Sequence, residues 1–255
     1  MRSLAVENPR LYGDLAWTWP IIRPPEDYVG EAQEIVRLLR THARGEPQTL
    51  LHLGCGGGHL DATLKRSLAV TGVDVSLSML ALAQRLNPEV DYVEGDMRTV
   101  RIGRTFDAVL IADSIDYMRT EEELLAAFRT GWEHLRPGGV LVTYAEHALE
   151  RFRQDETVTS THEAKDVRIT FIEHRHDPDP TDTTFDITFV WLISRAGGLK
   201  VESDRHVAGL FSMDAWRRCL SKAGFKVTEV AGFPEDSGES VPTFVGIRAS
   251  EAKPL

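Results

Sequence analysis

The sequence predicts an α/β fold: a Rossmann-like, seven-stranded, mostly parallel sheet with helices on both faces and a small antiparallel β insertion. Between residues 49 and 144, short apolar runs alternate with helical patterns. Strands that are apolar on both faces and alternate with helices are typical of a buried parallel sheet. After residue 165, polar and apolar residues alternate instead, which is typical of half-solvated antiparallel strands.

The elements of the parallel sheet follow in order. Apolar residues at helical spacing predict a first helix at 26–43. The helix at 77–86 is expected to stop before Asn87 and Pro88, and the helix at 121–135 begins with an acidic turn that suits the positive end of its macrodipole. Strands are expected at 49–53, 69–73, 90–93, 106–111 and 140–144, with a further helix at 60–67 and a turn at 136–139.

The remainder of the chain predicts an insertion followed by a return to the main sheet. A helix is expected at 212–223, with Ser212 as its N-cap and Gly224 beyond its end. Two strands, at 225–230 and 243–248, complete the main sheet, and the last of them is expected to be antiparallel. The insertion itself is expected to hold three strands, at 165–175, 184–193 and 199–206, with turns at 177–180 and 197–198.

Composition limits the classes of partner. The formal net charge is −10, from 39 acidic and 29 basic residues, so a nucleic acid would be repelled at long range and is not expected as a substrate. The sequence shows no run of about 18 apolar residues that could span a bilayer and no signal-peptide pattern at its start. Cys55 and Cys219 lie far apart and indicate neither a disulfide framework nor a zinc site. We therefore expect a cytoplasmic protein with no membrane partner.

The most informative segment is the run LLHLGCGGGH at residues 50–59. A strand that runs into glycines and then into a helix lets the backbone approach a ligand closely and directs helix N–H groups at it. Asp74 follows Gly54 by twenty residues, at the end of the second strand, where a carboxylate can accept hydrogen bonds from both hydroxyls of an adenosine ribose. Together these two features predict a site for a nucleoside-containing cofactor.

The glycine pattern distinguishes between such cofactors. A dinucleotide fingerprint has glycine at its sixth position, where this chain has His59, and the glycines here run as GxGxG over Gly54, Gly56 and Gly58. This pattern resembles motif I of the class I S-adenosylmethionine-dependent methyltransferases. Further segments resemble the same family in order and spacing: Val73-Asp74-Val75-Ser76 with Met79, Gly95-Asp96-Met97, Phe106-Asp107-Ala108-Val109 and Leu135-Arg136-Pro137-Gly138-Gly139.

The end of the chain narrows the resemblance to small-molecule N-methyltransferases. The chain most resembles the deoxyaminosugar N,N-dimethyltransferases and, to a lesser degree, the glycine N-methyltransferase group. The resemblance implies methyl transfer from S-adenosyl-L-methionine to a small-molecule acceptor, with an amine nitrogen preferred over a hydroxyl oxygen. It also implies that the inserted strands border the substrate, and these strands are compatible with a homodimer. The segments that carry it are the inserted strands, Arg205-His206-Val207, Leu210-Phe211-Ser212, Ala223-Gly224-Phe225 and Phe244-Val245-Gly246.

Residues 1–255 are then expected to form a single methyltransferase domain. Three other functions remain open from the residues: O-methylation of a small molecule, a nucleotide-dependent oxidoreductase, and a non-catalytic cofactor-binding protein. His59 and the segment Gly95-Asp96-Met97 disfavour the oxidoreductase. The parts of the domain are an N-terminal arm and helix at 1–45, a cofactor-binding core at 46–148, the insertion at 150–210, and the C-terminal helix and strands at 211–250.

The resemblance implies which residues contact the cofactor. Asp74 is expected to hold the ribose, and Asp96 with the backbone of Met97 is expected to hold the adenine. Asp113 and Ser114 follow the fourth strand and are expected at the sulfur and methionine end, although Ser114 could instead cap the next turn. The other expected contacts are Tyr12, His52, Gly54, Cys55, Gly56, Gly58, Val75 and Met79.

One position departs from the family pattern. His52 stands where the family usually carries an acid, which commonly lies beneath the glycine loop and supports the methionine end of the cofactor. A neutral imidazole can still accept or donate one hydrogen bond. Cofactor binding can therefore survive at this position, while its affinity is open to question.

The catalytic candidates are Tyr117, Glu146 and His147. Methyl transfer is an in-line displacement that depends on holding the acceptor lone pair about 3 Å from the methyl carbon. An amine must also lose a proton, which a His, a Tyr or a carboxylate can accept. All three candidates follow the fourth or fifth strand, at the edge where such sheets bind ligands. The alternative is that Tyr117 packs under a loop and that His147 is merely solvated.

Aromatic residues at the start of the chain have two interpretations. Tyr12, Trp17 and Trp19 could form a lid over the active site, or they could anchor the arm to the core, which we favour for the two tryptophans. His174 and His176 share a face of one strand, which we interpret as a wet polar surface. We therefore expect no metal site.

Overall fold

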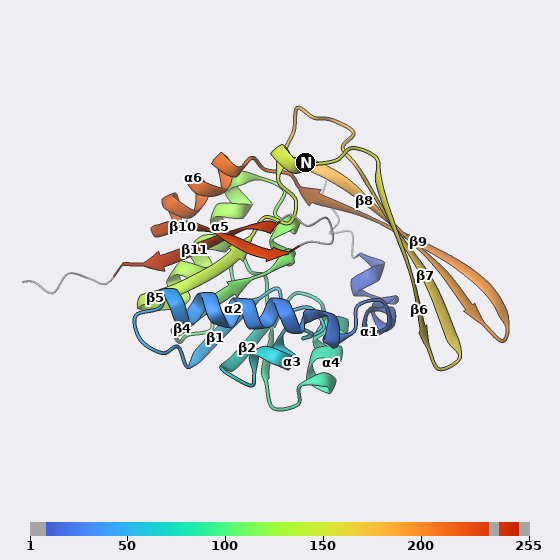
Figure 1. Ribbon diagram of the computed structural model, residues 1–255, viewed down its shortest axis with the longest axis horizontal. Helices are drawn as coiled ribbons and strands as arrows, with labels where there is room; N and C mark the ends of the chain where they lie inside the picture. The colour runs from blue at the N-terminus through green and yellow to red at the C-terminus, as the bar shows by residue number, and fades with distance from the viewer. Residues whose placement is uncertain (1–8, 235–239, 250–255) are drawn as a thin grey trace, which may run out of the picture.

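Seven strands form one mixed sheet, as predicted, in the computed structural model of the chain, which describes residues 9–234 and 240–249 (Figure 1). The strand order is β10-β11-β5-β4-β1-β2-β3. β11 runs antiparallel to both β5 and β10, whereas β1, β2, β3, β4 and β5 pair in parallel. The strands are β1 (Thr49–Leu53), β2 (Ala69–Asp74), β3 (Asp91–Glu94), β4 (Phe106–Ile111), β5 (Leu135–Tyr144), β10 (Phe225–Pro234) and β11 (Ser240–Arg248).

Helices cover both faces of this sheet, and α4, α5 and α6 each begin with a side-chain cap. Ser212 accepts a hydrogen bond from the backbone N–H of Ala215, and Gly224 follows the helix with φ 103°, so both predicted ends are confirmed. Thr120 and Ser76 cap two further helices in the same way. The helices are α2 (Val29–His42), α3 (Asp61–Leu64), α4 (Leu77–Leu86), α5 (Glu121–His134) and α6 (Met213–Ala223).

Two hydrophobic clusters lie on opposite faces of the main sheet. Leu50 and Leu51 belong to separate clusters, because successive residues of a strand point to opposite faces. On one face α5 and α6 contribute Phe128 and Trp216, and on the other α2 contributes Ile35. The carboxyl ends of the parallel strands are thereby held rigidly at one edge.

The insertion forms a second, four-stranded antiparallel sheet in the order β6-β7-β8-β9. In β8 buried and half-buried residues alternate, as the predicted half-solvated pattern requires. The sequence predicted three of these strands and missed β6, because its side chains are mostly polar on both faces and give no hydrophobic alternation. The strands are β6 (Glu156–Ala164), β7 (Val167–His176), β8 (Thr184–Arg195) and β9 (Gly198–Gly209).

Two further predictions need correction. The helix expected at 60–67 is only the four residues of α3, because the N–H groups of Arg66 and Ser67 bond three residues back and the chain must turn into β2 at Ala69. The turn expected at 136–139 lies inside β5, where the register against β4 shifts between Phe106 and Ala108. A bulge-like irregularity thus absorbs the glycine-rich segment without ending the strand.

The N-terminal arm lies between the two sheets (Figure 1). Leu11, Leu15 and Ile22 are buried against the inner face of the antiparallel sheet. Trp19 packs against the same cluster, whereas Trp17 is 37% exposed. Residues 1–8 of the expected arm lie outside the described residues. The described arm consists of η1 (Arg10–Tyr12), η2 (Ala16–Thr18), α1 (Trp19–Ile22) and η3 (Pro25–Tyr28).

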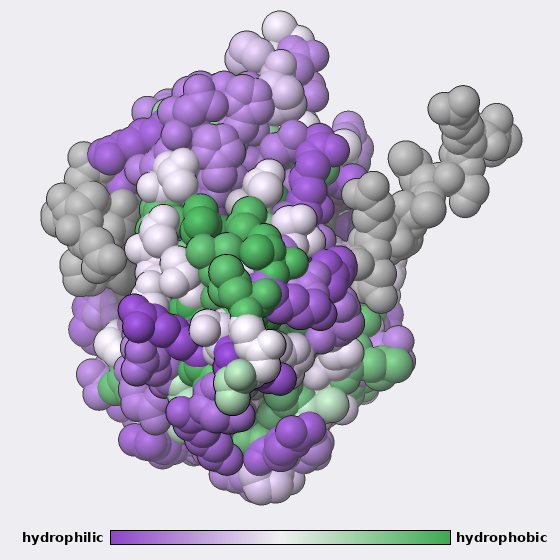
Figure 2. Space-filling model, turned by 90° about the vertical axis from the view of Figure 1, so that its right-hand side faces the viewer, coloured by the Kyte–Doolittle hydropathy of each residue, from purple (hydrophilic) through white to green (hydrophobic). Residues whose placement is uncertain are grey.

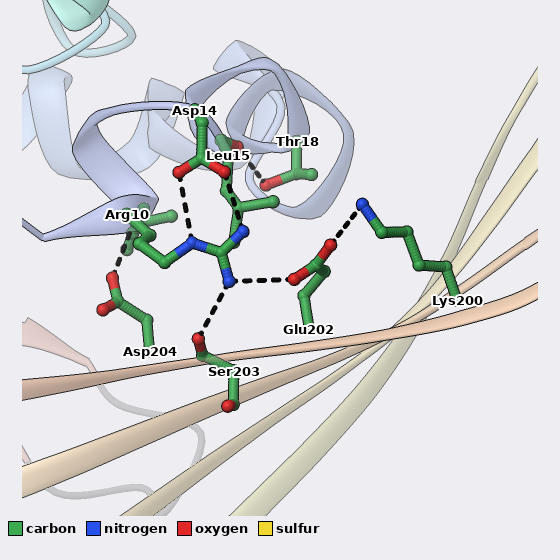
Figure 3. A network of polar contacts seen from close by, with 9 residues as sticks. Arg10, Asp14, Leu15, Thr18, Lys200, Glu202, Ser203 and Asp204 are labelled. Atoms are coloured by element: carbon green, nitrogen blue, oxygen red, sulfur yellow. Dashed lines mark hydrogen bonds and ion pairs between the residues drawn. The ribbon is translucent and has the colours of Figure 1, made fainter.

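A polar network fixes this arm to β9 (Figure 3). The Arg10 guanidinium donates to the carboxylates of Asp14 and Glu202, at 2.7 and 2.8 Å. It also donates to the carbonyl of Ser203, and the Leu11 N–H donates to Asp204 at 2.8 Å. These contacts hold Arg10 and Leu11 against β9 and so fix the position of the next residue of the arm, Tyr12. Among the described residues, no helix has the length and apolar character needed to cross a bilayer.

Candidate active site

The glycine run after β1 forms a loop that only glycine can build. Gly54, Gly56 and Gly58 all have positive φ, at 75°, 53° and 71°, a region that side chains disfavour. A Cβ on Gly54 would lie 2.0 Å from the hydroxyl oxygen of Ser114, and a Cβ on Gly58 would lie 2.6 Å from that of Tyr92. The loop is therefore closely packed from beneath, with no room for a side chain at Gly54 or Gly58.

Hydrogen bonds fix this loop to the end of β2. The N–H groups of Gly54 and Cys55 donate to the carbonyl of Val73, at 2.7 and 2.9 Å. The Asp74 carboxylate accepts from the N–H groups of Gly56 and Ser76, both at 2.8 Å. The predicted ribose-binding acid is thus held beside the predicted cofactor loop.

Burial raises the pKa of Asp74, and the backbone hydrogen bonds from Ser76 and Gly56 offset only part of this effect. Next to this carboxylate, Val75 and Leu77 are each 65% exposed, which leaves apolar surface for a flat ring. Met79 is buried, with its methyl carbon 3.5 Å from the Cβ position of Gly56. An acceptor for sugar hydroxyls and an apolar surface thus lie side by side.

The predicted adenine-binding acid already has a partner. Both carboxylate oxygens of Asp96 accept from the Arg98 guanidinium, at 2.6 to 3.0 Å. Burial alone would raise the pKa of Asp96, but the hydrogen bonds from Arg98 outweigh it and hold the pKa below its usual range. The backbone N–H of Arg98 also donates to Asp96, at 2.8 Å, so the contacts from Arg98 already use the roughly four lone-pair sites of this carboxylate, and an adenine amino group would have to displace one of them. Met97 is buried beneath Gly54.

His52 lies buried at the carboxyl end of β1. Its Nδ1 is 2.8 Å from a carboxylate oxygen of Asp61 on α3. Burial alone would lower the pKa of His52, but the charge of Asp61 and its hydrogen bond raise it. The acid missing at this position is thus present nine residues later.

Asp113 and Ser114 follow β4 in η4 (Asp113–Tyr117). Ser114 donates to the carbonyl of Leu53 at 3.4 Å, so it contacts the glycine loop. The Asp113 side chain is exposed. Protein nonetheless surrounds it closely enough to weaken its hydration, and with the nearby charges of Glu146 and Asp116 this raises its pKa to about 7.

Four side chains form a continuous chain of hydrogen bonds from the arm to β9. The Tyr12 hydroxyl lies 2.7 Å from the Tyr117 hydroxyl, which lies 2.6 Å from Nδ1 of His206. Nε2 of His206 lies 2.8 Å from the Asp204 carboxylate. At the other end, the Tyr12 carbonyl accepts from the hydroxyl of Ser76 at 2.6 Å. Tyr12 therefore bridges the cofactor loop region and Tyr117.

The other two catalytic candidates, Glu146 and His147, lie beside a second acid, Asp116. Asp116, Glu146 and His147 bring their polar atoms within 4.8 Å of one another. His147 Nδ1 is 2.7 Å from Asp116, which raises the pKa of His147 although burial alone would lower it. Burial raises the pKa of Asp116 to about 6, against the hydrogen bond from His147. This end of β5 therefore presents carboxyl groups and one half-buried imidazole.

Several residues of the site were missed from the sequence. His206 and Asp204 stand two apart on β9, so the strand period places them on one face. Glu31 was missed on α2, where it accepts from the Tyr144 hydroxyl at 2.7 Å, and burial raises its pKa to about 7. Asp61 and Asp116 had no local signal beyond their charge.

Known proteins share both the sequence pattern and the fold. Residues 50–139 match the family described as methyltransferase domain. The chain is 32% identical to dTDP-3-amino-3,4,6-trideoxy-alpha-D-glucopyranose N,N-dimethyltransferase of Streptomyces venezuelae over 226 residues, 88% of this chain and 92% of that protein.

Two solved structures resemble the whole chain. The crystal structure of DesVI from Streptomyces venezuelae superimposes with a TM-score of 0.80 and 28% identity, covering 92% of this chain and 96% of that one. CalS10, an amino pentose methyltransferase from Micromonospora echinaspora with S-adenosylmethionine bound, gives a TM-score of 0.77 and 26% identity over 87% of this chain and 92% of that one. The oxidoreductase and the non-catalytic alternatives are therefore set aside. The chain belongs to the class I S-adenosylmethionine-dependent methyltransferases, grouped with small-molecule N-methyltransferases, and transfers a methyl group from S-adenosylmethionine to a small-molecule acceptor.

Proposed function

We propose that this methyltransferase methylates the amino group of a nucleotide-linked amino sugar. Three curated relatives are named as N,N-dimethyltransferases of dTDP-linked amino sugars. The observation that carries the proposal is the hydrogen-bonded chain Tyr12–Tyr117–His206–Asp204 beside the carboxyl groups of the site. The Tyr12 hydroxyl and the carboxyl groups can bind an amine, and His206 can accept the proton that the amine must lose.

The residues present fit S-adenosylmethionine. The proposed cradle is the positive-φ backbone of the glycine loop, with Asp74 on the ribose and Val75 beside the adenine. Asp96 and the backbone of Met97 are proposed to contact the adenine, and Asp113 and Ser114 the methionine end. His52, Cys55, Met79 and Tyr12 complete the proposed set.

The carboxyl groups of Asp113, Asp116 and Glu146 are proposed to attract the amine in its ammonium form. Their negative charges are close enough for each to affect the pKa of a neighbour. Opposite charge at such short range stabilises the bound ammonium more in a partly desolvated site than in water. An uncharged hydroxyl acceptor would gain nothing comparable.

The donor and acceptor of each hydrogen bond in the series Tyr12–Tyr117–His206–Asp204 are fixed by the carboxylate at its end. The Asp204 carboxylate can only accept, so Nε2 of His206 carries the proton and Nδ1 accepts from the Tyr117 hydroxyl. The Tyr117 oxygen then accepts from the Tyr12 hydroxyl, which leaves the Tyr12 oxygen to accept from the substrate. Burial lowers the pKa of His206 despite Asp204, so the imidazole is neutral and ready to accept a proton.

S-adenosylmethionine supplies an electrophilic methyl group on its sulfonium sulfur. The ammonium of the acceptor first loses a proton along Tyr12 and Tyr117 to Nδ1 of His206, which becomes an imidazolium paired with Asp204. The free nitrogen lone pair then forms the N–C bond as the C–S bond breaks, with the electron pair staying on sulfur. For a second methylation the N-methylammonium must lose another proton. Before that, His206 must release the first proton from its Nδ1 to solvent.

We further propose that the protein is a homodimer formed through the outer face of the antiparallel sheet. Figure 2, which views the molecule from that side, shows an apolar patch in the middle of the face. The alternation of β7, β8 and β9 points Ile172, Val190, Leu192 and Val201 outward, and Val201 is 59% exposed. A flat apolar patch of this kind suits a twofold contact between two copies.

The whole chain is proposed to act as one domain, since the arm and the antiparallel sheet supply Tyr12 and His206 to the site of the main sheet. A cytoplasmic location is proposed as well. Cys55 and Cys219 are both buried as free thiols, which suits a reducing compartment.

Turnover with matched acceptors tests the function. Purified protein is given S-adenosylmethionine with a dTDP-linked 3-amino-3,6-dideoxyhexose or with the corresponding 3-hydroxy sugar, and release of S-adenosylhomocysteine is measured. We expect turnover with the amine and none with the hydroxyl sugar. Turnover with the hydroxyl sugar alone would establish O-methylation instead.

A further inference from the structure

Asp116, Glu146 and His147 bring three metal-binding side chains within reach of one ion. Each offers one ligand atom, a carboxylate oxygen or an imidazole nitrogen, and the three atoms all lie within 4.8 Å of one another. Ligand atoms about 2.1 Å from a divalent ion stand roughly 3 to 3.5 Å from their neighbours, so rotations of these side chains can close the set around an ion. Within the described part of the chain, no other group of three or more such side chains meets this spacing.

The three side chains come from two adjacent loops at the carboxyl edge of the main sheet. Asp116 belongs to η4, which follows β4, and Glu146 and His147 follow β5, the strand paired with β4. Nδ1 of His147 lies 2.7 Å from a carboxylate oxygen of Asp116, so these two ligand atoms already stand side by side. Their side chains are 11% and 8% exposed, whereas Glu146 is exposed. An ion therefore has a path past Glu146, and on binding it displaces the proton shared by the other two.

Negative charge exceeds positive charge around this set. The carboxyl group of Asp113 lies close enough to interact with both acids of the set. The guanidinium of Arg175 on β7 acts on the set as a cation, but it is already paired with the carboxylates of Glu173 and Glu156, at 2.6 and 2.9 Å. Carboxylates that share a partly desolvated site attract a cation more strongly than they would in water. The set therefore has the charge, as well as the ligand atoms, that an ion requires.

The donor atoms select the kind of ion. Two carboxylates with one imidazole suit first-row transition ions and Zn²⁺, whereas Mg²⁺ and Ca²⁺ prefer oxygen ligands alone. We propose that Asp116, Glu146 and His147 form a site for a divalent ion of the Zn²⁺ class, and that this ion competes with the acceptor amine for the same carboxylates. The competition rests on the proposed function, in which these carboxylates attract the ammonium. A bound ion then inhibits methylation of the amine.

This set has no signature in the sequence. In the chain, 31 residues separate Asp116 from His147, and the pairing of β4 with β5 brings them together. The expectation of no metal site rests on His174 and His176, which belong to no set of three ligands with this spacing. The proposed ion site replaces that expectation at a different place in the fold.

Titration calorimetry of the full-length protein with Zn²⁺, Mn²⁺ and Mg²⁺, without cofactor or acceptor, tests the ion site itself. We expect Zn²⁺ to bind at one site per chain, Mn²⁺ to bind more weakly and Mg²⁺ to bind most weakly, because an imidazole ligand favours Zn²⁺. Equal affinity for Zn²⁺ and Mg²⁺ would show an acidic surface without an imidazole ligand and would overturn the inference. Absence of Zn²⁺ binding would overturn it as well. Neither result depends on turnover, so the ion site is tested separately from the proposed function.

Asp116→Asn, Glu146→Gln and His147→Gln each remove one ligand with little change in size. We expect each to weaken Zn²⁺ by more than the factor of about ten to a hundred that is typical for loss of a group behind a metal ligand. The control carries His174→Gln and His176→Gln together and should bind Zn²⁺ unchanged. Loss of Zn²⁺ in the control, with full affinity in His147→Gln, would place the ion on β7 instead. Thermal melting identifies any variant that fails to fold, and Glu146→Gln, at an exposed position, then carries the test.

Two matched sugars test the competition with the amine. A dTDP-linked 3-amino-3,6-dideoxyhexose and the corresponding 3-hydroxy sugar share a diphosphate that itself binds Zn²⁺, so they differ only in the amine. We expect saturating Zn²⁺ to weaken binding of the amino sugar by about tenfold more than binding of the hydroxy sugar, the loss of a charge-assisted contact. Equal weakening of both sugars would refute the competition. Equal affinity of both sugars without Zn²⁺ would instead refute the proposed amine site, and the Zn²⁺ titration would still decide the ion site.

Discussion

The hydroxyl oxygen of Tyr117 lies 2.6 Å from Nδ1 of His206, although 89 residues separate them in the sequence. Tyr117 comes from η4, which follows β4 of the main sheet, and His206 comes from β9 of the inserted sheet. The contact makes the insertion part of the proposed active site. It also sets the direction of the proposed proton path, because Asp204 fixes the protonated nitrogen of His206.

Tyr117→Phe tests this path with little change in packing. The ring keeps its edge contact with Tyr12, whose centroid lies 5.6 Å away, while the hydroxyl link is lost. We expect kcat to fall by about a hundredfold, the lower range for a general base, with the affinity for S-adenosylhomocysteine unchanged. Steady-state kinetics and titration calorimetry measure the two quantities. An unchanged kcat would remove Tyr117 from the mechanism.

The pH profile of the same reaction reports on His206. Burial holds the pKa of His206 below its usual 6.5, and the path needs the neutral ring. The contribution of His206 to kcat is therefore expected to be full at pH 7 and to be lost as the pH falls through a value below 6.5. His206→Gln should lower kcat and abolish this acidic limb. If the acidic limb of the kcat profile stays at the same pH in His206→Gln, the titrating group is the substrate amine or a carboxyl group and not His206.

Asp74→Ala tests the ribose assignment. The carboxylate accepts from Gly56 and Ser76 and is proposed to accept from the ribose as well, so its loss should weaken S-adenosylhomocysteine by about tenfold to a hundredfold. Asp74→Asn keeps the size of the side chain and should retain part of the affinity. Titration calorimetry gives both values. Full affinity in Asp74→Ala would place the ribose elsewhere.

Glu31 makes stability depend on pH with a defined sign. Its pKa is raised from 4.5 to about 7 in the folded protein, so between these values the folded state binds more protons than the unfolded chain. The free energy of unfolding should therefore fall as the pH rises through this window. Asp113 and Asp116 act in the same direction.

Glu31→Gln removes one such group. We expect the variant to be more stable than the unaltered protein at pH 8 by on the order of 2 kcal/mol, with a smaller difference or none at pH 4.5. Urea unfolding at several pH values measures this. Parallel stability curves for the two proteins would mean that Glu31 titrates normally.

Leu192→Glu tests the proposed dimer. Leu192 lies on the outward face of β8 beside Val201, so a charge there should separate the copies without disturbing the buried face. Sedimentation velocity should show a dimer for the unaltered protein and a monomer for the variant. Lys222→Glu on α6 is the control and should remain dimeric. A monomer in the unaltered protein would refute the proposal outright.

Much of the main sheet could be predicted because local signals dominate there. The predicted bounds of β1, β4 and α4 agree with the structure. These segments are short apolar runs or regular helical patterns, and the glycine loop follows from positions where a Cβ would collide with packed neighbours. Local pattern and tertiary packing agree at such places.

The parts that failed depend on contacts distant in sequence. β6 is held by its pairing with β7 and not by its own hydrophobicity. The Tyr12–Tyr117–His206 contacts join the arm, the main sheet and the insertion, and no spacing rule connects them. The pairing of His52 with Asp61 spans the glycine loop, so the departure at His52 was visible in the sequence while its compensating acid was not.

Methyl transfer to nitrogen at this site is tested most directly by following the methyl carbon itself. The protein is incubated with S-adenosylmethionine carrying a ¹³C-labelled methyl group and with a dTDP-linked amino sugar that offers both an amine and a free hydroxyl. Carbon-edited NMR of the product then distinguishes an N-methyl from an O-methyl group. We predict label on nitrogen alone, and its loss in Tyr117→Phe. Label on oxygen, or an unlabelled sugar with the cofactor bound, would contradict the proposed function.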